Sequence, residues 1–95
     1  MLKHIVLMKF KEEVTDQQIA DLQSSLLALP PVIREIKGYE CGRDLRPARK
    51  FDFALVSTFA DVAALESYKV RPEHVAVLHK VRNLSAAIEA VDFDY

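Results

Sequence analysis

The chain begins with a segment, residues 3–11, in which β-branched and long apolar side chains occupy both sets of alternating positions. Because successive side chains of a strand point to opposite faces, this pattern predicts a strand that is apolar on both faces. Residues 51–59 have the same character. Two such strands in one sheet need apolar cover on both of its sides.

One helix is predicted after the first strand. Thr15 and Gln18 have the spacing of a capping box, in which each side chain satisfies a backbone N–H group at the start of the helix. Apolar residues then recur at helical spacing until Pro30 and Pro31 end the run. The segment therefore forms an amphipathic helix with one apolar side available for packing.

The rest of the chain predicts two more strands and a second, broken helix. Residues 32–44 have the looser pattern and the glycines of an edge strand, and residues 86–95 end in alternating apolar and acidic positions, like a final strand. Asp61 can cap a helix that Pro72 breaks, and a further helical piece continues through Val81. We therefore expect a bent or split helix.

The resulting order is strand, helix, strand, strand, helix, strand, which is the order of the ferredoxin-like βαββαβ fold. This α+β fold has an antiparallel four-stranded sheet with its helices on one face. The other face must then be buried by something outside the chain or surround an internal cavity. A homodimer that packs sheet face against sheet face is the simplest arrangement.

Composition restricts the classes of partner. The 95 residues carry 13 Lys and Arg against 14 Asp and Glu, which favours neither nucleic acid nor an anionic membrane as a partner. The single cysteine, Cys41, cannot form an internal disulfide, and no segment approaches the about 18 apolar residues of a membrane-spanning helix. We expect one domain, residues 1–95, in a cytoplasmic protein.

Three blocks of sequence carry a resemblance to a known family. They are residues 4–10 (HIVLMKF), residues 68–75 (YKVRPEHV) and residues 91–95 (VDFDY), which together span nearly the whole chain. On these residues the chain resembles the stress-responsive A/B barrel domain (Dabb) family, a branch of the dimeric α/β barrel superfamily. The resemblance implies a ferredoxin-like protomer whose sheet pairs with a second copy to form a dimeric α/β barrel with an internal cavity.

The resemblance also implies candidate site residues. One branch of the family includes a plant polyketide cyclase that closes a linear polyketide thioester by intramolecular aldol condensation, whereas other members are oligomeric stress proteins without an established reaction. The catalytic tyrosine and histidine of the cyclase correspond to Tyr68 and His74 in this chain. A histidine of its substrate pocket corresponds to His4.

Two functions follow from these residues. In the first, the barrel binds a small, apolar, carbonyl-containing molecule; a neutral His74 removes a proton from the carbon beside a carbonyl group, and the Tyr68 phenol stabilises the developing oxyanion while His4 orients the ligand. In the second, the chain is a non-enzymatic stress-responsive structural protein. His74 would then bond to the backbone and fix the helix break, and Tyr68 and His4 would serve packing alone.

No cofactor and no metal site built from side chains is expected, and the family resemblance leaves open a structural cation held by main-chain oxygens near residues 30–36. The two glycines, Gly38 and Gly42, do not form a phosphate-binding loop. His79 lies five positions after His74, whereas two helical histidines that share a metal are four apart. The acidic pair Asp92 and Asp94 is expected to be a solvated strand face rather than a catalytic carboxylate pair.

Overall fold

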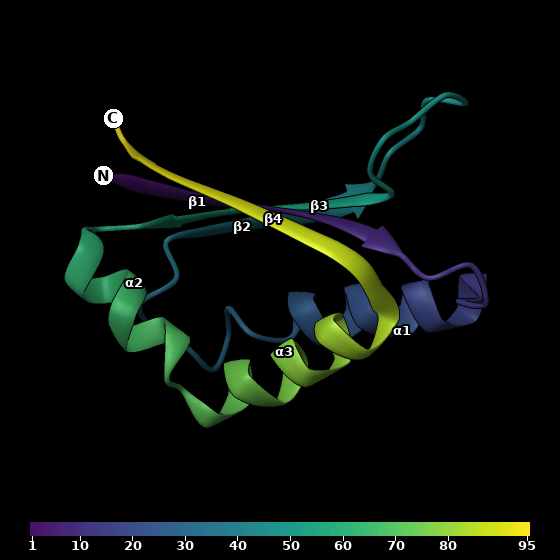
Figure 1. Cartoon of the computed structure of the whole chain (residues 1–95). Helices are drawn as coiled ribbons and strands as arrows, with labels where there is room; N and C mark the ends of the chain where they lie inside the picture. The colour runs from purple at the N-terminus through teal and green to yellow at the C-terminus, as the bar shows by residue number, and fades with distance from the viewer.

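The computed structural model describes residues 1–95 as a single antiparallel sheet with three helices packed on one face (Figure 1). In chain order the elements are β1 (Leu2–Phe10), α1 (Asp16–Leu27), β2 (Gly38–Arg43), β3 (Phe53–Phe59), α2 (Val62–Lys69), α3 (Pro72–Leu84) and β4 (Ser85–Asp94). The strands lie in the order β2-β3-β1-β4. The expected ferredoxin-like arrangement is therefore confirmed.

Local sequence explains where the helices begin and break. Both halves of the capping box between Thr15 and Gln18 form at the start of α1. The Asp61 carboxylate accepts the Ala64 N–H at 2.8 Å and starts α2. Pro72, which has no N–H to donate, occupies the first turn of α3, so the predicted broken helix is two helices.

The second and third strands are shorter than their patterns predict. Residues 30–36 form turns instead of the start of a strand: the Val32 and Ile33 N–H groups donate to the Leu29 carbonyl, and Ile33 is fully buried. Asp52, just before β3, accepts the Phe10 N–H at 2.8 Å through its side chain and donates its own N–H to Met8 at 2.8 Å. These bonds hold the end of the β2–β3 connection against β1.

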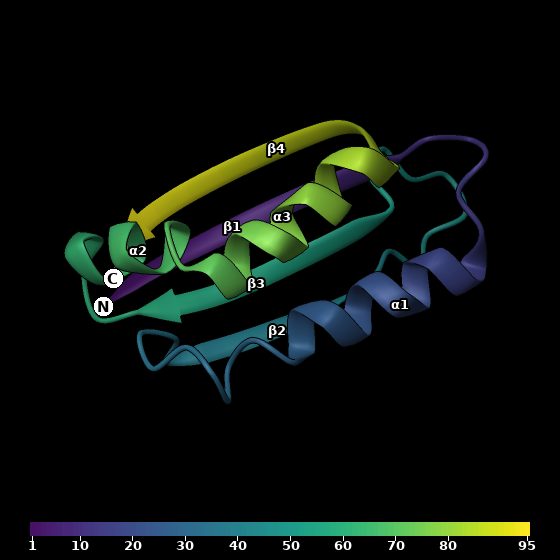
Figure 2. The ribbon, with the colours of Figure 1, turned by 90° about the horizontal axis from the view of Figure 1, so that it is seen from below.

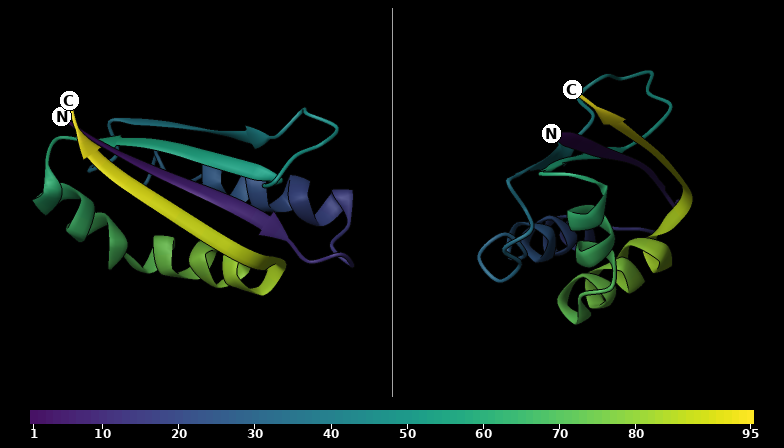
Figure 3. Two further views of the ribbon diagram at one scale, coloured as in Figure 1. Left: turned by 45° about the horizontal axis from the view of Figure 1, so that its top comes forward. Right: turned by 90° about the vertical axis from the view of Figure 1, so that its left-hand side faces the viewer.

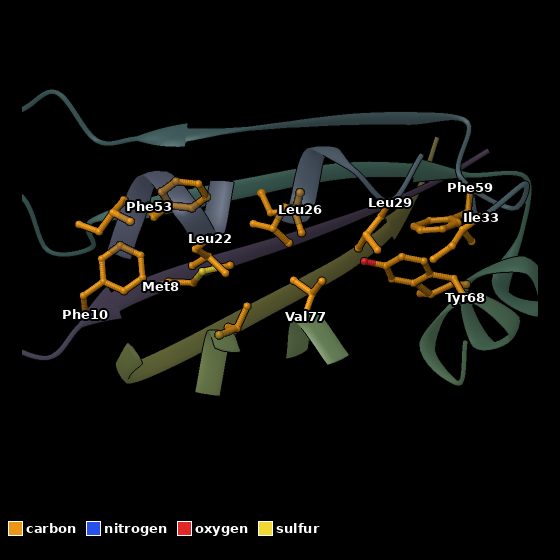
Figure 4. Close-up of a cluster of buried hydrophobic side chains, with 14 of the residues drawn as sticks. Met8, Phe10, Leu22, Leu26, Leu29, Ile33, Phe53, Phe59, Tyr68 and Val77 are labelled. Carbon is orange, nitrogen blue, oxygen red and sulfur yellow. The ribbon is translucent and has the colours of Figure 1, made fainter. Parts of the chain in front are cut away.

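The core lies between the sheet and the helices. Figure 2 shows α1 alongside β2 and α3 in front of β1 and β3, and Figure 4 shows Met8, Phe10 and Phe53 of the sheet facing Leu22 of α1. The buried apolar residues are Leu2, Met8, Phe10, Ile19, Leu22, Leu26, Leu29, Ile33, Phe53, Leu55, Phe59, Leu65, Tyr68, Val77 and Val81. Alternate side chains of β1 and β3 therefore point into the core, so one face of each strand is buried.

The opposite face of the sheet is uncovered by this chain and carries a row of apolar side chains, with Glu40 opposite Val56 and Glu89 opposite Leu7. Ile5 pairs with Val56 of β3 on one side and with Val91 of β4 on the other, so the three side chains lie in a row across the sheet. Val91 is 59% exposed, and Phe93, two residues further on, is 44% exposed. We call this surface, made by Ile5, Leu7, Val56, Val91 and Phe93, the open sheet face.

The two ends of the chain lie side by side, as both views in Figure 3 show. The Tyr95 N–H donates to the Met1 carbonyl at 3.0 Å. Strand β4 consequently pairs with β1 along its whole length, from Leu2 opposite Asp94 to Phe10 opposite Ser85. The longest helix, α3, has 13 residues, and no helix has the length and hydrophobicity to cross a bilayer.

Candidate functional site

A pocket of about 410 Å³ lies between the sheet and helices α2 and α3. Its walls are His4, Val6, Met8, Leu26, Leu55, Tyr68, Lys69, His74, Val77, Leu78, Val81, Arg82, Ile88 and Ala90. The family resemblance implies a cavity on the open sheet face, inside a barrel made with a second copy. The pocket instead lies on the helix side of the sheet within one protomer, where residues as small as Ala90 and Val6 face the helices.

His74 enters the pocket from the first turn of α3, just after the helix break. Its Nδ1 lies 3.0 Å from the main-chain oxygen of Lys69, at the end of α2. A carbonyl oxygen can only accept, so Nδ1 carries the ring proton and Nε2 holds the free lone pair. Nε2 has no hydrogen-bond partner in the protein and is not sealed from solvent. The helix break thus fixes the tautomer of a histidine that can accept a proton.

The surroundings of His74 favour its neutral form. Burial lowers the pKa of the imidazole below its ordinary value, and the hydrogen bond to Lys69 opposes this shift without cancelling it. Charge interactions with His4, Lys69 and Arg82 lower this pKa further. The ring is therefore an unprotonated base at neutral pH.

Tyr68 lies at the end of α2 and is 1% exposed. Its ring packs against Phe59, with centroids 4.9 Å apart, and against the His74 ring, with centroids 4.2 Å apart. Figure 4 shows the Tyr68 hydroxyl directed away from the Phe59 end, towards Leu29. Core packing therefore holds the phenol rigidly beside the histidine.

The Tyr68 hydroxyl lies 2.8 Å from the hydroxyl of Tyr39 in β2. Burial raises the pKa of both phenols, so both keep their protons at neutral pH. When Tyr39 is the donor of this bond, the Tyr68 proton is free for a ligand, since Tyr68 lines the pocket and Tyr39 does not. Tyr39 was not among the predicted site residues, because the sequence indicates only which strand face it occupies.

His4 lies opposite Asp92 in the pairing of β1 with β4, and its Nδ1 forms a hydrogen bond to the Asp92 carboxylate. The side chain of His4 is 13% exposed and that of Asp92 is 40% exposed. Asp92 is exposed, as expected of a solvated strand face, but it also holds His4, a contact that the sequence did not predict; Asp94 has no such partner. Antiparallel pairing of the first and last strands is the signal that could have identified Asp92.

Comparisons with known proteins agree with this arrangement. The family model described as the stress responsive A/B barrel domain, Dabb, matches residues 2–95. The chain belongs to the Dabb family. It is 27% identical over 77 residues to olivetolic acid cyclase of Cannabis sativa, and the aligned region covers 78% of this chain and 76% of the cyclase.

Two solved structures resemble this Dabb chain over nearly its whole length. A dimeric ferredoxin-like protein of unknown function from Thermobifida fusca has a TM-score of 0.91 and 32% identity, covering 99% of this chain and 90% of that one. A dimeric protein of unknown function from Bacteroides fragilis has a TM-score of 0.90 and 28% identity, with coverages of 99% and 95%. The Dabb protomer is therefore a well-represented fold.

The three candidate residues of the Dabb chain, His4, Tyr68 and His74, all line the one pocket. His79 does not line it, and no three His, Cys, Asp or Glu side chains gather closely enough to hold a metal ion. What the pocket offers is an apolar wall, two imidazoles and a phenol. These groups can accept a proton from a ligand carbon and donate a hydrogen bond to a ligand oxygen.

Proposed function

We propose that this Dabb protein binds a small, largely apolar, carbonyl-containing molecule in the protomer pocket and removes a proton from the carbon beside a carbonyl group. An aldol-type ring closure of a β-carbonyl substrate would follow. The observation that carries the proposal is the free Nε2 of His74, which lines the same apolar pocket as the Tyr68 phenol. Olivetolic acid cyclase, a relative at 27% identity, supports a cyclase-like reaction.

The proposed reaction begins when Nε2 of His74 takes the proton from the carbon between two carbonyl groups. The electron pair of the C–H bond moves to the adjacent carbonyl oxygen, and the phenolic proton of the Tyr68–Tyr39 pair donates a hydrogen bond to that oxygen. The enolate carbon then attacks a second carbonyl of the same molecule. The resulting alkoxide takes the proton back from the His74 imidazolium, so the enzyme returns to its starting state.

His4 has a different proposed role from His74. Its Nδ1 is held by the Asp92 carboxylate, which leaves Nε2 as the ring atom available to a ligand. Asp92 fixes the orientation of the ring, as carboxylates do for histidines in other enzyme sites. We assign His4 to ligand orientation and Asp92 to the positioning of His4.

The open sheet face supports a homodimer in which two copies pack sheet against sheet. Phe93, at 44% exposed, and Val91, at 59% exposed, are large apolar residues on this face. The relatives from Thermobifida fusca and Bacteroides fragilis, at 32% and 28% identity, are described as dimeric. A 95-residue chain buries only a modest core of its own, so burial of this face in a dimer would add to its stability.

One observation favours the alternative of a non-enzymatic stress-responsive structural protein. Each polar side chain facing the pocket from its His4–Tyr68 end already has a partner within the protomer: Asp92 for His4, Tyr39 for Tyr68 and the backbone for His74. A structural protein needs such satisfaction of buried groups. The two functions differ in whether the free Nε2 of His74 ever receives a proton from a ligand.

Turnover of a defined panel separates the two functions. β-Keto and poly-β-keto acyl compounds, offered as thioesters and as free acids, would be incubated with the protein, and ring-closed products would be identified by mass spectrometry. We expect a product whose formation is lost in His74→Ala and retained in His79→Ala, the matched change of an exposed histidine on the same helix. Equal yields with His74→Ala and with the wild-type protein would refute the proposed role of His74.

A further inference from the structure

The side of α3 that faces the pocket has a positively charged residue, Arg82, at its C-terminal end. Residues His74, Val77, Leu78, Val81 and Arg82 follow one another at the spacing of a single helical stripe, and all of them line the pocket. The first four are the uncharged and apolar residues expected on a buried stripe. Arg82 is exposed and lines the pocket at the end of this stripe, where it places a cation beside an otherwise apolar wall.

Arg82 lies at the opposite end of the pocket from the two histidines. Eight residues of helix separate it from His74, which corresponds to about 12 Å along the helix axis. The strand β4 runs between the same two ends of the pocket. Asp92 pairs with His4 near one end of β4, whereas Ser85, which follows α3, pairs with Phe10 at the other. The pocket is therefore polar at its His4 end, apolar along its length and positively charged at its far end.

The charge of Arg82 is unpaired within the chain. Arg43, Arg46 and Arg49 each form an ion pair with an aspartate, at 3.1, 2.9 and 3.1 Å respectively. Lys69, the other cation on the pocket wall, lies 3.3 Å from the Glu66 carboxylate. No Asp or Glu lines the pocket, so nothing on its walls neutralises Arg82.

We infer that the pocket takes a linear oxo acid, with its carbonyl end at His74 and Tyr68 and a free carboxylate paired with Arg82. The placement of the carbonyl end of the ligand at His74 and Tyr68 rests on the proposed function. The guanidinium can hold a carboxylate through two parallel N–H donors, and helical side chains lean towards the N-terminus, which directs Arg82 back over Leu78 and the pocket. Arg82 is thus a specificity-determining residue that selects acids over uncharged esters.

A matched pair of ligands tests this assignment without any turnover. Nonanoic acid and methyl nonanoate have the same apolar chain and differ in the charge that Arg82 would bind. Their dissociation constants would be measured by NMR titration of the folded protein, with the Arg82 side-chain N–H as a direct probe. We expect the wild-type protein to bind the acid about tenfold more tightly than the ester, because a hydrogen bond to a charged group contributes this much.

Three variants assign the preference to Arg82. Arg82→Met should lower affinity for the acid to that for the ester and leave affinity for the ester within about twofold, a fold-change below the effect of one charged hydrogen bond. Arg82→Lys should retain part of the preference, since it keeps the charge and loses the planar fork. Arg34→Met, which removes an exposed arginine outside the pocket, should change neither affinity.

The ester provides the control for a structural role. Arg82 lies in the last turn of α3, where a cation also stabilises the helix, and loss of that effect would weaken binding of acid and ester equally. Equal losses in Arg82→Met, an unchanged affinity for the acid, or failure of both ligands to bind would overturn the inference. Acid selectivity in a wild-type protein that turns over none of the β-keto compounds would refute the proposed reaction and leave the ligand class standing.

Discussion

The hydroxyl groups of Tyr39 and Tyr68 lie 2.8 Å apart, one on the edge strand β2 and the other at the end of α2. The two phenols join the sheet to the helix that ends at the pocket. Both phenols are protonated at neutral pH, and when Tyr39 donates to Tyr68 the Tyr68 proton is left for a ligand oxygen in the pocket. The pair therefore combines a structural bond with the hydrogen-bond donor that the proposed reaction needs.

Removing either hydroxyl should destabilise the protein. Tyr39→Phe leaves the buried Tyr68 hydroxyl without its partner, and we expect a loss of about 1–2 kcal/mol in the free energy of unfolding, measured with urea. Tyr68→Phe should cost a similar amount, and the double variant should cost clearly less than the sum. Tyr95→Phe, at a residue 61% exposed, is the control and should change stability little. Additive losses would show that the two hydroxyls do not interact.

His74 predicts a specific dependence of stability on pH. Burial lowers its pKa below the ordinary value of 6.5, so the unfolded chain binds a proton at a pH where the folded protein does not. The contribution of this residue to stability is complete above that ordinary value and is lost as the pH falls through it. Urea unfolding between neutral pH and pH about 5 should therefore show a steeper decline for the wild-type protein than for His74→Gln.

The exposed histidine of the same helix gives the control. His79→Gln should retain the wild-type decline, since it changes an exposed side chain and leaves the buried surroundings of His74 intact. A decline that is unchanged in His74→Gln would mean that the His74 ring is not the buried neutral imidazole described here.

Asp92 should matter for ligand binding through His4. In Asp92→Asn the carboxylate that accepts the His4 Nδ1 proton becomes an amide, which weakens the bond and loosens the ring. We expect affinity for a β-keto acyl ligand to fall about tenfold by NMR titration, as for other partners that orient a functional histidine. Asp94→Asn, two residues further along the same strand, should keep wild-type affinity. Equal effects of the two changes would point to general electrostatics instead of the contact with His4.

The homodimer can be tested on the open sheet face. Val56→Glu places a charge at the centre of this face, between Ile5 and the exposed edge, and should give monomers in sedimentation equilibrium because an unpaired charge is costly to bury. Val62→Glu makes the same substitution at a valine that is 56% exposed on α2, outside the sheet, and should leave the dimer intact. A stable dimer of Val56→Glu would contradict the proposed interface.

The order of the elements could be predicted from the sequence because each boundary has a local chemical cause. Thr15 and Asp61 supply caps, and Pro72 breaks a helix, and these effects depend only on neighbouring residues. The sequence also showed that both faces of the first strand are apolar. What the pattern could not tell was which of Leu55 and Val56 faces the helices, and Leu55 is the buried residue that lines the pocket.

The candidate site could be predicted only in part. His4, Tyr68 and His74 came from the family resemblance, and the structure brings all three to one pocket. Tyr39 and Asp92 were missed because their roles depend on pairing between segments 29 and 88 residues apart in sequence. The position of the pocket was also missed, since the space between a sheet and its helices depends on packing distances that hydrophobic periodicity does not encode.

Proton removal at His74 is the central claim, and hydrogen–deuterium exchange at carbon tests it most directly. A β-keto acyl thioester would be dissolved in D₂O buffer with the protein, and loss of the signal from the protons between its carbonyl groups would be followed by NMR. We predict exchange well above the buffer rate for the wild-type protein and for His79→Ala, and exchange at the buffer rate for His74→Ala. Equal exchange in His74→Ala and the wild-type protein would contradict the claim.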